Sequence, residues 1–389
     1  MVKTVLLAAA ALAVASSLAD DVTSAGKPTA ELKAECVRYA RENGFADFAD
    51  ELEAQDDLTT WIDGTIRFCE GRLKACEDVS AFDCGRQRVL RLLDYPLHVD
   101  NCFPQMPKDE ARAYERAAVD YVRRAVRRVL EEVKSTAVAQ GSLRAWHVYN
   151  MAYVLKGPQH TVLIDFTPYP HFEGCETWTD ADWQAFAEIG DVLAVTHPHR
   201  DHTSYPLMER MRTLGKPLVL PCAMTNRLTG VRYEAGDDVH VLSSDHAEPV
   251  DIGGVKFWNF MGFQGGVPCN TYLIEIDDVR VADNGDNSPK EREWNLVKCP
   301  PADVIISSSW SLVTNIVSAC AATPGFNRDT AVFLPSHENE LMHSVPHRES
   351  YQRLYGRTDR LGCPGFIWPR TAALAFGEST VFNRTEKKQ

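Results

Sequence analysis

The chain has 389 residues, of which 44% are hydrophobic and 24% are charged. This composition is typical of a globular protein and excludes a disordered or collagen-like chain. The formal net charge of −13 disfavours binding to nucleic-acid phosphates and to anionic membrane surfaces. The length predicts one large domain and a smaller one.

The N-terminus has the pattern of a secretory signal peptide over residues 1–19. Lys3 precedes an apolar run at 4–15, and small residues lead up to Ala19 before the acidic Asp20. This run is shorter than the roughly 20 residues that a bilayer requires, which favours a cleaved export signal over a membrane anchor. The sequence therefore predicts a secreted or periplasmic protein with no membrane span.

Residues 20–140 predict a small helical domain. Apolar residues recur every three or four positions at 108–134, with arginines on the opposite face, and 57–76 and 79–93 follow a similar spacing. Pro96 is expected to break the pattern. The arginine face is interpreted as a solvated surface rather than a ligand patch. This part shows no catalytic motif, and its protein partner, if it has one, is unknown.

Eleven cysteines are present in the chain. In an exported protein this number predicts disulfides, and an odd count leaves at least one thiol unpaired within the chain. The spacing of Cys69, Cys76 and Cys84 does not fit a zinc motif. We therefore expect a disulfide-linked, cysteine-rich helical domain.

After residue 140, short runs rich in β-formers alternate with turns and helices, which predicts a layered α/β domain over 141–378. Residues 379–389 are expected to form a C-terminal tail. The expected helices cover 180–188 and 204–214. The expected strands are 147–155, 161–166, 192–196, 217–220, 239–242, 255–260, 270–276, 279–282, 304–307 and 331–334.

A cluster of histidines follows the apolar run at 191–195. His197, His199, Asp201 and His202 lie within six residues at the end of this buried strand. Loop residues at strand ends converge on ligands. Imidazole and carboxylate together are the ligand set of zinc, iron and manganese sites, so the cluster predicts a metal site.

These four residues match the His-x-His-x-Asp-His motif, and the sequence resembles the metallo-β-lactamase superfamily. The resemblance continues at 162–165 as an early strand, at Asp286 as the motif carboxylate, and at His337 after a late strand. The spacing and the segment 205–221 are most similar to the L-ascorbate-6-phosphate lactonase-like branch. The resemblance implies an αββα sandwich and does not include the helical domain.

The resemblance also implies the chemistry. The protein would bind one or two divalent metal ions, most simply zinc, with iron or manganese as alternatives. A metal-activated hydroxide would attack a small-molecule lactone, ester or phosphoester. Asp201 would orient that hydroxide, and Asp286 would bridge the metals. The implied ligands are His197, His199, Asp201, His202, Asp286 and His337.

One ligand that the resemblance implies is missing. The family has a histidine in the loop after the strand that corresponds to 255–260, whereas the loop at 261–269 contains no histidine. Asp286, water, Gln264, Cys269 or His246 could replace it, or a single metal could bind at Asp201, His202, Asp286 and His337. Further candidate metal or substrate residues are Asp283, Gln264, His343 and His347. Glu338, Glu340 and Glu349 surround the last two, and this cluster could hold partners of metal-binding histidines, contact substrate or form a solvated polar loop.

Two other functions remain open. A degenerate fold could serve as a non-catalytic secreted binding protein, which the missing histidine favours and the intact motif disfavours. A nuclease of the same superfamily is disfavoured by the acidic charge and by the absence of a basic, aromatic-rich segment.

Overall fold

The computed structural model describes residues 29–76, 79, 83–99, 107–172, 174–226, 228–287, 298, 300–308, 323–327, 330–359 and 371–384. The predicted signal peptide lies outside these ranges, as do Cys102, Cys299, Cys320 and Cys363. No helix in the described ranges combines the length and hydrophobicity that a membrane span requires.

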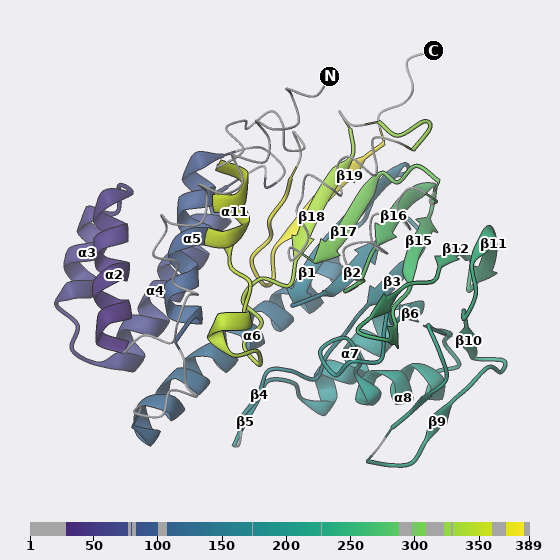
Figure 1. The fold of residues 1–389 in the computed structure, drawn as a ribbon, viewed down its shortest axis with the longest axis horizontal. Coiled ribbons are helices and arrows are strands. Elements are labelled where there is room, and N and C mark those ends of the chain that lie inside the picture. The colour runs from purple at the N-terminus through teal and green to yellow at the C-terminus, as the bar shows by residue number, and fades with distance from the viewer. Residues whose placement is uncertain are drawn as a thin grey trace, which may run out of the picture.

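The helices gather mostly in the N-terminal third of the chain (Figure 1). They are α2 (Thr29–Glu42), α3 (Ala46–Glu53), α4 (Leu58–Lys74), α5 (Cys84–Leu97), α6 (Lys108–Ser135), α7 (Asp180–Ile189), α8 (Tyr205–Thr213), η1 (Val345–His347) and α11 (Tyr351–Asp359). The helix predicted at 108–134 is confirmed as α6, whose buried residues recur every three or four positions. The prediction for Pro96 is wrong: it lies inside the last turn of α5, which ends one residue later.

The strands form two main sheets. In the first sheet they are β1 (Ser142–Tyr149), β2 (Ala152–Lys156), β3 (Thr161–Ile164), β6 (Val192–Ala194), β7 (Leu218–Leu220), β10 (Val239–Val241) and β19 (Ser379–Asn383). In the second they are β11 (His246–Ile252), β12 (Val255–Phe260), β15 (Thr271–Ile276), β16 (Val279–Asp283), β17 (Val304–Ser308) and β18 (Val332–Ser336). Short two-stranded pairs are β4 (His171–Phe172) with β5 (Cys175–Glu176), β8 (Met224–Thr225) with β9 (Arg232–Tyr233), and β13 (Phe263–Gln264) with β14 (Val267–Pro268).

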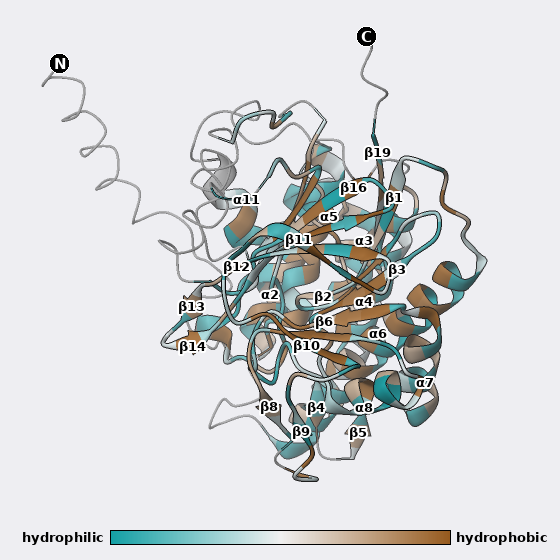
Figure 2. Cartoon of the chain, turned by 90° about the vertical axis from the view of Figure 1, so that its right-hand side faces the viewer, coloured by the Kyte–Doolittle hydropathy of each residue, from teal (hydrophilic) through white to brown (hydrophobic). Residues whose placement is uncertain are grey.

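The strand order is β10-β7-β6-β3-β2-β1-β19 in the first sheet and β11-β12-β15-β16-β17-β18 in the second. The two sheets share one apolar core, in which Leu155 and Ile164 of the first meet Phe257 and Ile306 of the second. Figure 2 shows these central strands mostly as brown, hydrophobic ribbons. Helices α6 and α8 contact the first sheet on its other face. The mixed α/β fold expected from the sequence is confirmed.

Three local predictions differ from the structure. The single strand expected at 147–155 is a hairpin of β1 and β2, because Asn150 turns the chain with a φ of 57°. Strand β11 was not predicted from the sequence, because most of its residues are exposed or half-buried and do not alternate regularly between apolar and polar. Residues 379–383, expected in the tail, form β19 and pair with β1 at the edge of the first sheet.

The cysteines correct a further expectation, because those in the described ranges are free thiols: Cys36, Cys69, Cys76, Cys84, Cys175, Cys222 and Cys269. A disulfide-linked helical domain is therefore not supported by these residues. Cys36 and Cys69 are fully buried in the helical core, where a thiol packs as a small apolar group. Burial raises the pKa of both thiols, which keeps them protonated.

The helices and the sheets share a second, larger core that runs without interruption from α2 to α8 and α11. A buried ion pair joins the two parts, since Arg86 of α5 donates to the carboxylate of Glu378 at 2.8 and 2.5 Å. The same guanidinium donates to the carbonyl of Ala373 at 2.7 Å. A domain boundary at residue 140 stays a prediction.

Candidate metal centre

The predicted ligands come from three strand ends that meet at one edge of the two sheets. The segment from His197 to His202 follows β6 of the first sheet. Asp286 follows β16, and His337 follows β18, both in the second sheet. Strand ends of a layered sheet are the usual place for polar residues that bind ligands. The structure therefore brings together residues that lie up to 140 positions apart in the chain.

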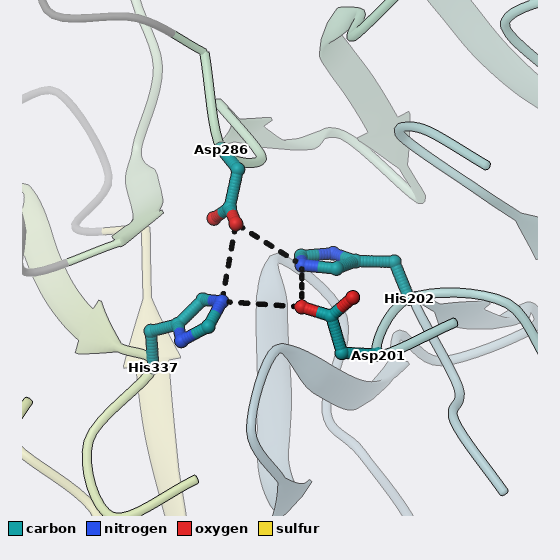
Figure 3. Close-up of side chains that lie close together, drawn as sticks. All are labelled: Asp201, His202, Asp286 and His337. Atoms are coloured by element: carbon teal, nitrogen blue, oxygen red, sulfur yellow. Dashed lines mark hydrogen bonds and ion pairs between the residues drawn. The ribbon is translucent and has the colours of Figure 1, made fainter. Parts of the chain in front are cut away.

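Four side chains form a ring around one point. In Figure 3 the carboxylates of Asp201 and Asp286 alternate with the imidazoles of His202 and His337, and all four point toward one another. The Nε2 atom of His202 lies 3.3 Å from Oδ2 of Asp201 and 3.4 Å from Oδ2 of Asp286. The Nε2 atom of His337 lies 3.6 and 3.1 Å from the same two oxygens.

These separations suit a metal ion. Ligand atoms bound tetrahedrally at roughly 2.0–2.1 Å lie about 3.3–3.4 Å from one another. The four measured sides of the ring, 3.1 to 3.6 Å, bracket that value. All four ligand atoms lie within 4.8 Å of one another, so no pair is too far apart to share one ion.

A second group adjoins the ring. His197, His199 and Asp201 also offer ligand atoms within 4.8 Å of one another. The His197 and His199 rings lie 4.6 Å apart, centroid to centroid. His197 is buried and its Nε2 atom has no hydrogen-bond partner among the described residues. A buried imidazole nitrogen without a partner is costly unless a ligand uses it, so Nε2 is a candidate metal ligand.

Asp165, which follows β3, fixes the protonation of the histidines. Its Oδ2 accepts a hydrogen bond from Nδ1 of His202 at 2.7 Å and one from Oγ1 of Thr196 at 2.6 Å. The Thr196 hydroxyl, having donated its proton, accepts from Nδ1 of His197 at 3.2 Å. Both imidazoles thus keep a proton on Nδ1, so Nε2 is the nitrogen that faces the centre and would serve as the metal ligand.

Glu340 lies close to the outer nitrogen of His337. Its Oε2 lies 3.4 Å from Nδ1 of His337, an ion-pair distance, while Nε2 of His337 faces the ring. The same oxygen lies 2.5 Å from Nδ1 of His343, whose side chain is 36% exposed. His337, Glu340 and His343 therefore form a third group, in which one buried carboxylate serves two imidazoles.

Charges balance within the ring. Burial raises the pKa of Asp201 and Asp286, but the imidazoles of His202 and His337 outweigh it and lower both pKa values below the usual range. Burial lowers the pKa of the two imidazoles, yet the two carboxylates raise it well above 6.5. Two imidazolium charges thus balance the two carboxylate charges. A divalent cation bound by neutral imidazoles would supply the same two positive charges.

The remaining predicted residues have different positions. The Nε2 amide of Gln264 donates to Oδ2 of Asp286 at 3.2 Å, so Gln264 does reach the site. Asp283 belongs to none of the ligand groups of the described residues; its Oδ1 accepts from the Gly285 amide at 2.9 Å. Asp283 is the last residue of β16, and burial together with the nearby Asp165 charge raises its pKa well above the usual value.

His347 is exposed in η1 and belongs to none of the ligand groups of the described residues. Cys269 and His246, the other replacements considered for the missing histidine, also lie outside these groups. Sequence reasoning missed Asp165 and Thr196. A carboxylate directly after a buried apolar strand was the only signal for Asp165, and Thr196 gave none.

No family model matches the sequence, and neither does any of the curated proteins with which it was compared. Solved structures are similar only at low sequence identity. Igni18, a metallo hydrolase from Ignicoccus hospitalis, is 14% identical, with 63% of this chain and 100% of that chain covered and a TM-score of 0.41.

Two further structures resemble the chain to the same extent. The metallo-β-lactamase fold protein YhfI from Bacillus subtilis is 13% identical over 62% of this chain and 99% of its own, with a TM-score of 0.41. An isothiocyanate hydrolase from Delia radicum gut bacteria is 12% identical, with the same coverages and TM-score. At these scores the likeness is remote, and the chemistry of this chain has to be argued from its own side chains.

Proposed function

We propose that this protein is a metal-dependent hydrolase of the metallo-β-lactamase type. One observation carries the proposal: four side chains from two sheets form a closed ring in which both histidines turn Nε2 inward, toward two buried carboxylates. A ring of this kind has no packing purpose, since it buries two carboxylates and two imidazoles that apolar residues could replace.

Asp201, His202, Asp286 and His337 would hold one divalent ion, and His197 with His199 would hold a second that shares Asp201. Zinc suits this set of imidazole nitrogens and carboxylate oxygens best, and iron or manganese are the alternatives. When bound, such an ion lowers the pKa of coordinated water and polarises the oxygen of the substrate.

The chain's own residues would then place the reactants. The Asp201 side chain is 15% exposed, whereas that of Asp286 is 2% exposed, so Asp201 is the carboxylate that an incoming water meets. Its pKa lies below the usual range, because His202 outweighs the effect of burial. It therefore remains ionised at neutral pH, accepts a hydrogen bond from the attacking water and orients it.

The substrate class follows from the resemblance rather than from the geometry. We propose a small-molecule lactone, ester or phosphoester, as in the lactonase-like branch. The net charge of −13 makes a nucleic-acid substrate unfavourable. We further propose that the protein is exported, on the strength of residues 1–19; N-terminal sequencing of the mature protein would show whether cleavage occurs after Ala19.

The first test is the metal content of the full chain, purified without chelators and analysed by elemental mass spectrometry. We expect one or two equivalents of zinc, iron or manganese, and turnover of at least one lactone, ester or phosphoester in a chromogenic panel. His202→Ala, which removes a ligand of the ring, should lose metal and turnover, whereas the exposed His347→Ala should retain both. Unchanged metal content and turnover in His202→Ala would overturn the proposal. A metal-free protein that takes up no added metal would favour the non-catalytic binding protein.

A further inference from the structure

The loop that carries His337 has an unfavourable backbone. His337 and Asn339 both have positive φ values, 80° and 57°, which L-residues rarely adopt. Such conformations cost about 1–3 kcal/mol each and persist only where surrounding contacts hold them. The position of His337, and with it one corner of the metal ring, therefore depends on what holds this loop.

The loop is held by α5, a helix from the N-terminal third of the chain. The Nε2–H of His98 donates to Oδ1 of Asn339 at 2.8 Å, and Nδ2 of Asn339 donates to Oδ1 of Asp94 at 3.0 Å. Asp94, His98 and Asn339 are all buried. One turn of α5 thus binds both ends of the Asn339 amide, two residues beyond His337 and one before Glu340.

Asp94 also fixes the end of the same segment. Its Oδ1 accepts from the amide of Tyr351 at 3.1 Å, and its Oδ2 accepts from the amide of Gln352 at 2.7 Å. These two amides begin α11, so one carboxylate connects the start of that helix to the middle of the metal loop. Hydrogen bonds to a buried charge are about twice as strong as those between neutral groups.

Arg348 provides an independent connection between the same parts. Its guanidinium donates to the carbonyls of Leu341 at 3.1 Å and His343 at 2.7 Å, and it also contacts the carbonyl of Leu97 in α5. The loop is therefore attached to the last turn of α5 from two sides.

We propose that Asp94 and His98 are positioning residues of the metal centre. They hold Asn339 and thereby the left-handed backbone that directs Nε2 of His337 at Asp201 and Asp286. The helical part is then a structural support of the site rather than a separate binding module. This inference rests on the proposed metal site, and the residues concerned touch neither metal nor substrate.

The test compares metal affinity and ligand geometry in matched variants of the full chain. Zinc affinity is measured by competition with a chromogenic chelator, and the geometry is followed by the visible absorption of the Co²⁺-loaded protein. We expect Asp94→Ala and His98→Ala to weaken zinc binding about 10- to 100-fold and to change the Co²⁺ spectrum. His98→Gln, which keeps a donor toward Asn339, should restore most of the affinity.

Leu32→Ala is the control, because it removes a buried side chain from α2, which packs against α3 and α5. It should lower the thermal midpoint while leaving the zinc affinity and the spectrum unchanged. If Asp94→Ala does not fold, the positioning role is judged from the zinc affinity and the Co²⁺ spectrum of His98→Ala. A folded His98→Ala with wild-type zinc affinity and spectrum would overturn the positioning role but leave the metal site standing. A wild-type protein that binds neither ion would overturn both.

Discussion

Oδ2 of Asp165 lies 2.7 Å from Nδ1 of His202, although the two residues are 37 positions apart and follow different strands of the first sheet. Asp165 also accepts the Thr196 amide at 2.7 Å, which joins the end of β3 to the end of β6. Its left-handed backbone, with a φ of 48°, turns the carboxylate back into the sheet edge. One buried residue thus sets both the local geometry and the tautomer of a candidate ligand.

Asp165→Asn should weaken zinc binding by about 10- to 100-fold, as is typical when the partner of a metal-binding histidine is lost. An amide in place of the carboxylate presents a donor to Nδ1 of His202, which moves the imidazole proton to Nε2 and blocks the ligand atom. Chelator competition measures the change. Asp191→Asn is the control, because Asp191 accepts the Thr161 amide at another strand end of the same sheet. Equal affinity in Asp165→Asn would refute this role.

Removing the metal should destabilise the protein, because the ligands are assembled only in the folded state. Free zinc at 100 times its dissociation constant should add about 2.7 kcal/mol to the free energy of unfolding. Thermal unfolding with added zinc and with EDTA measures the difference. The response should vanish in His202→Ala and persist in His347→Ala. A thermal midpoint that is the same with zinc and with EDTA would contradict a folded-state metal site.

Gln264→His should increase metal binding. The Gln264 amide already lies 3.2 Å from Oδ2 of Asp286, so an imidazole at this position would add a nitrogen ligand where the sequence lacks one. We expect a metal content closer to two equivalents, measured by elemental mass spectrometry. Gln264→Ala is the comparison, since it removes the amide without adding a ligand. If both variants hold the same amount of metal as the wild type, position 264 plays no part in the site.

Arg86→Met should destabilise the fold by about 3–5 kcal/mol, because it leaves the carboxylate of Glu378 buried without its partner. The two side chains are only 3% and 10% exposed. Denaturant unfolding measures the loss. Arg86→Met combined with Glu378→Met should recover part of it, since the double variant buries no charge. A single variant as stable as the wild type would show that this pair does not join the helices to the sheets.

His98 should make stability fall in acid. Burial, and then the positive charges of Arg348 and Arg353, lower its pKa well below 6.5 in the folded state. Above about pH 6.5 neither state binds the proton and His98 causes no loss. As the pH falls below that value, the unfolded state takes up the proton first and stability declines, by up to about 1.4 kcal/mol per pH unit.

His98→Gln should therefore reduce the loss of unfolding free energy between pH 6.5 and 5.5, measured by denaturant titration at each pH. His347→Gln is the control, because His347 is exposed. An identical pH dependence in wild type and His98→Gln would mean that His98 is not held neutral in the fold.

The sequence by itself determined which residues carry the chemistry. The run from His197 to His202, with Asp286 and His337, could be found because each follows a short apolar strand, and strand and helix periodicity are local properties of the chain. The same local patterns located α6 and most strands of both sheets.

Only the tertiary structure decided how those residues are held. The pairing of Asp165 with His202, the approach of Gln264 to Asp286 and the attachment of Asn339 to Asp94 and His98 are contacts between segments far apart in the chain. The disulfides predicted for the helical part are also not found among its described cysteines, of which Cys36 and Cys69 are buried free thiols and Cys84 is an exposed one. Residue spacing reports the period of an element, whereas the partners of a buried polar group depend on which elements the fold brings side by side.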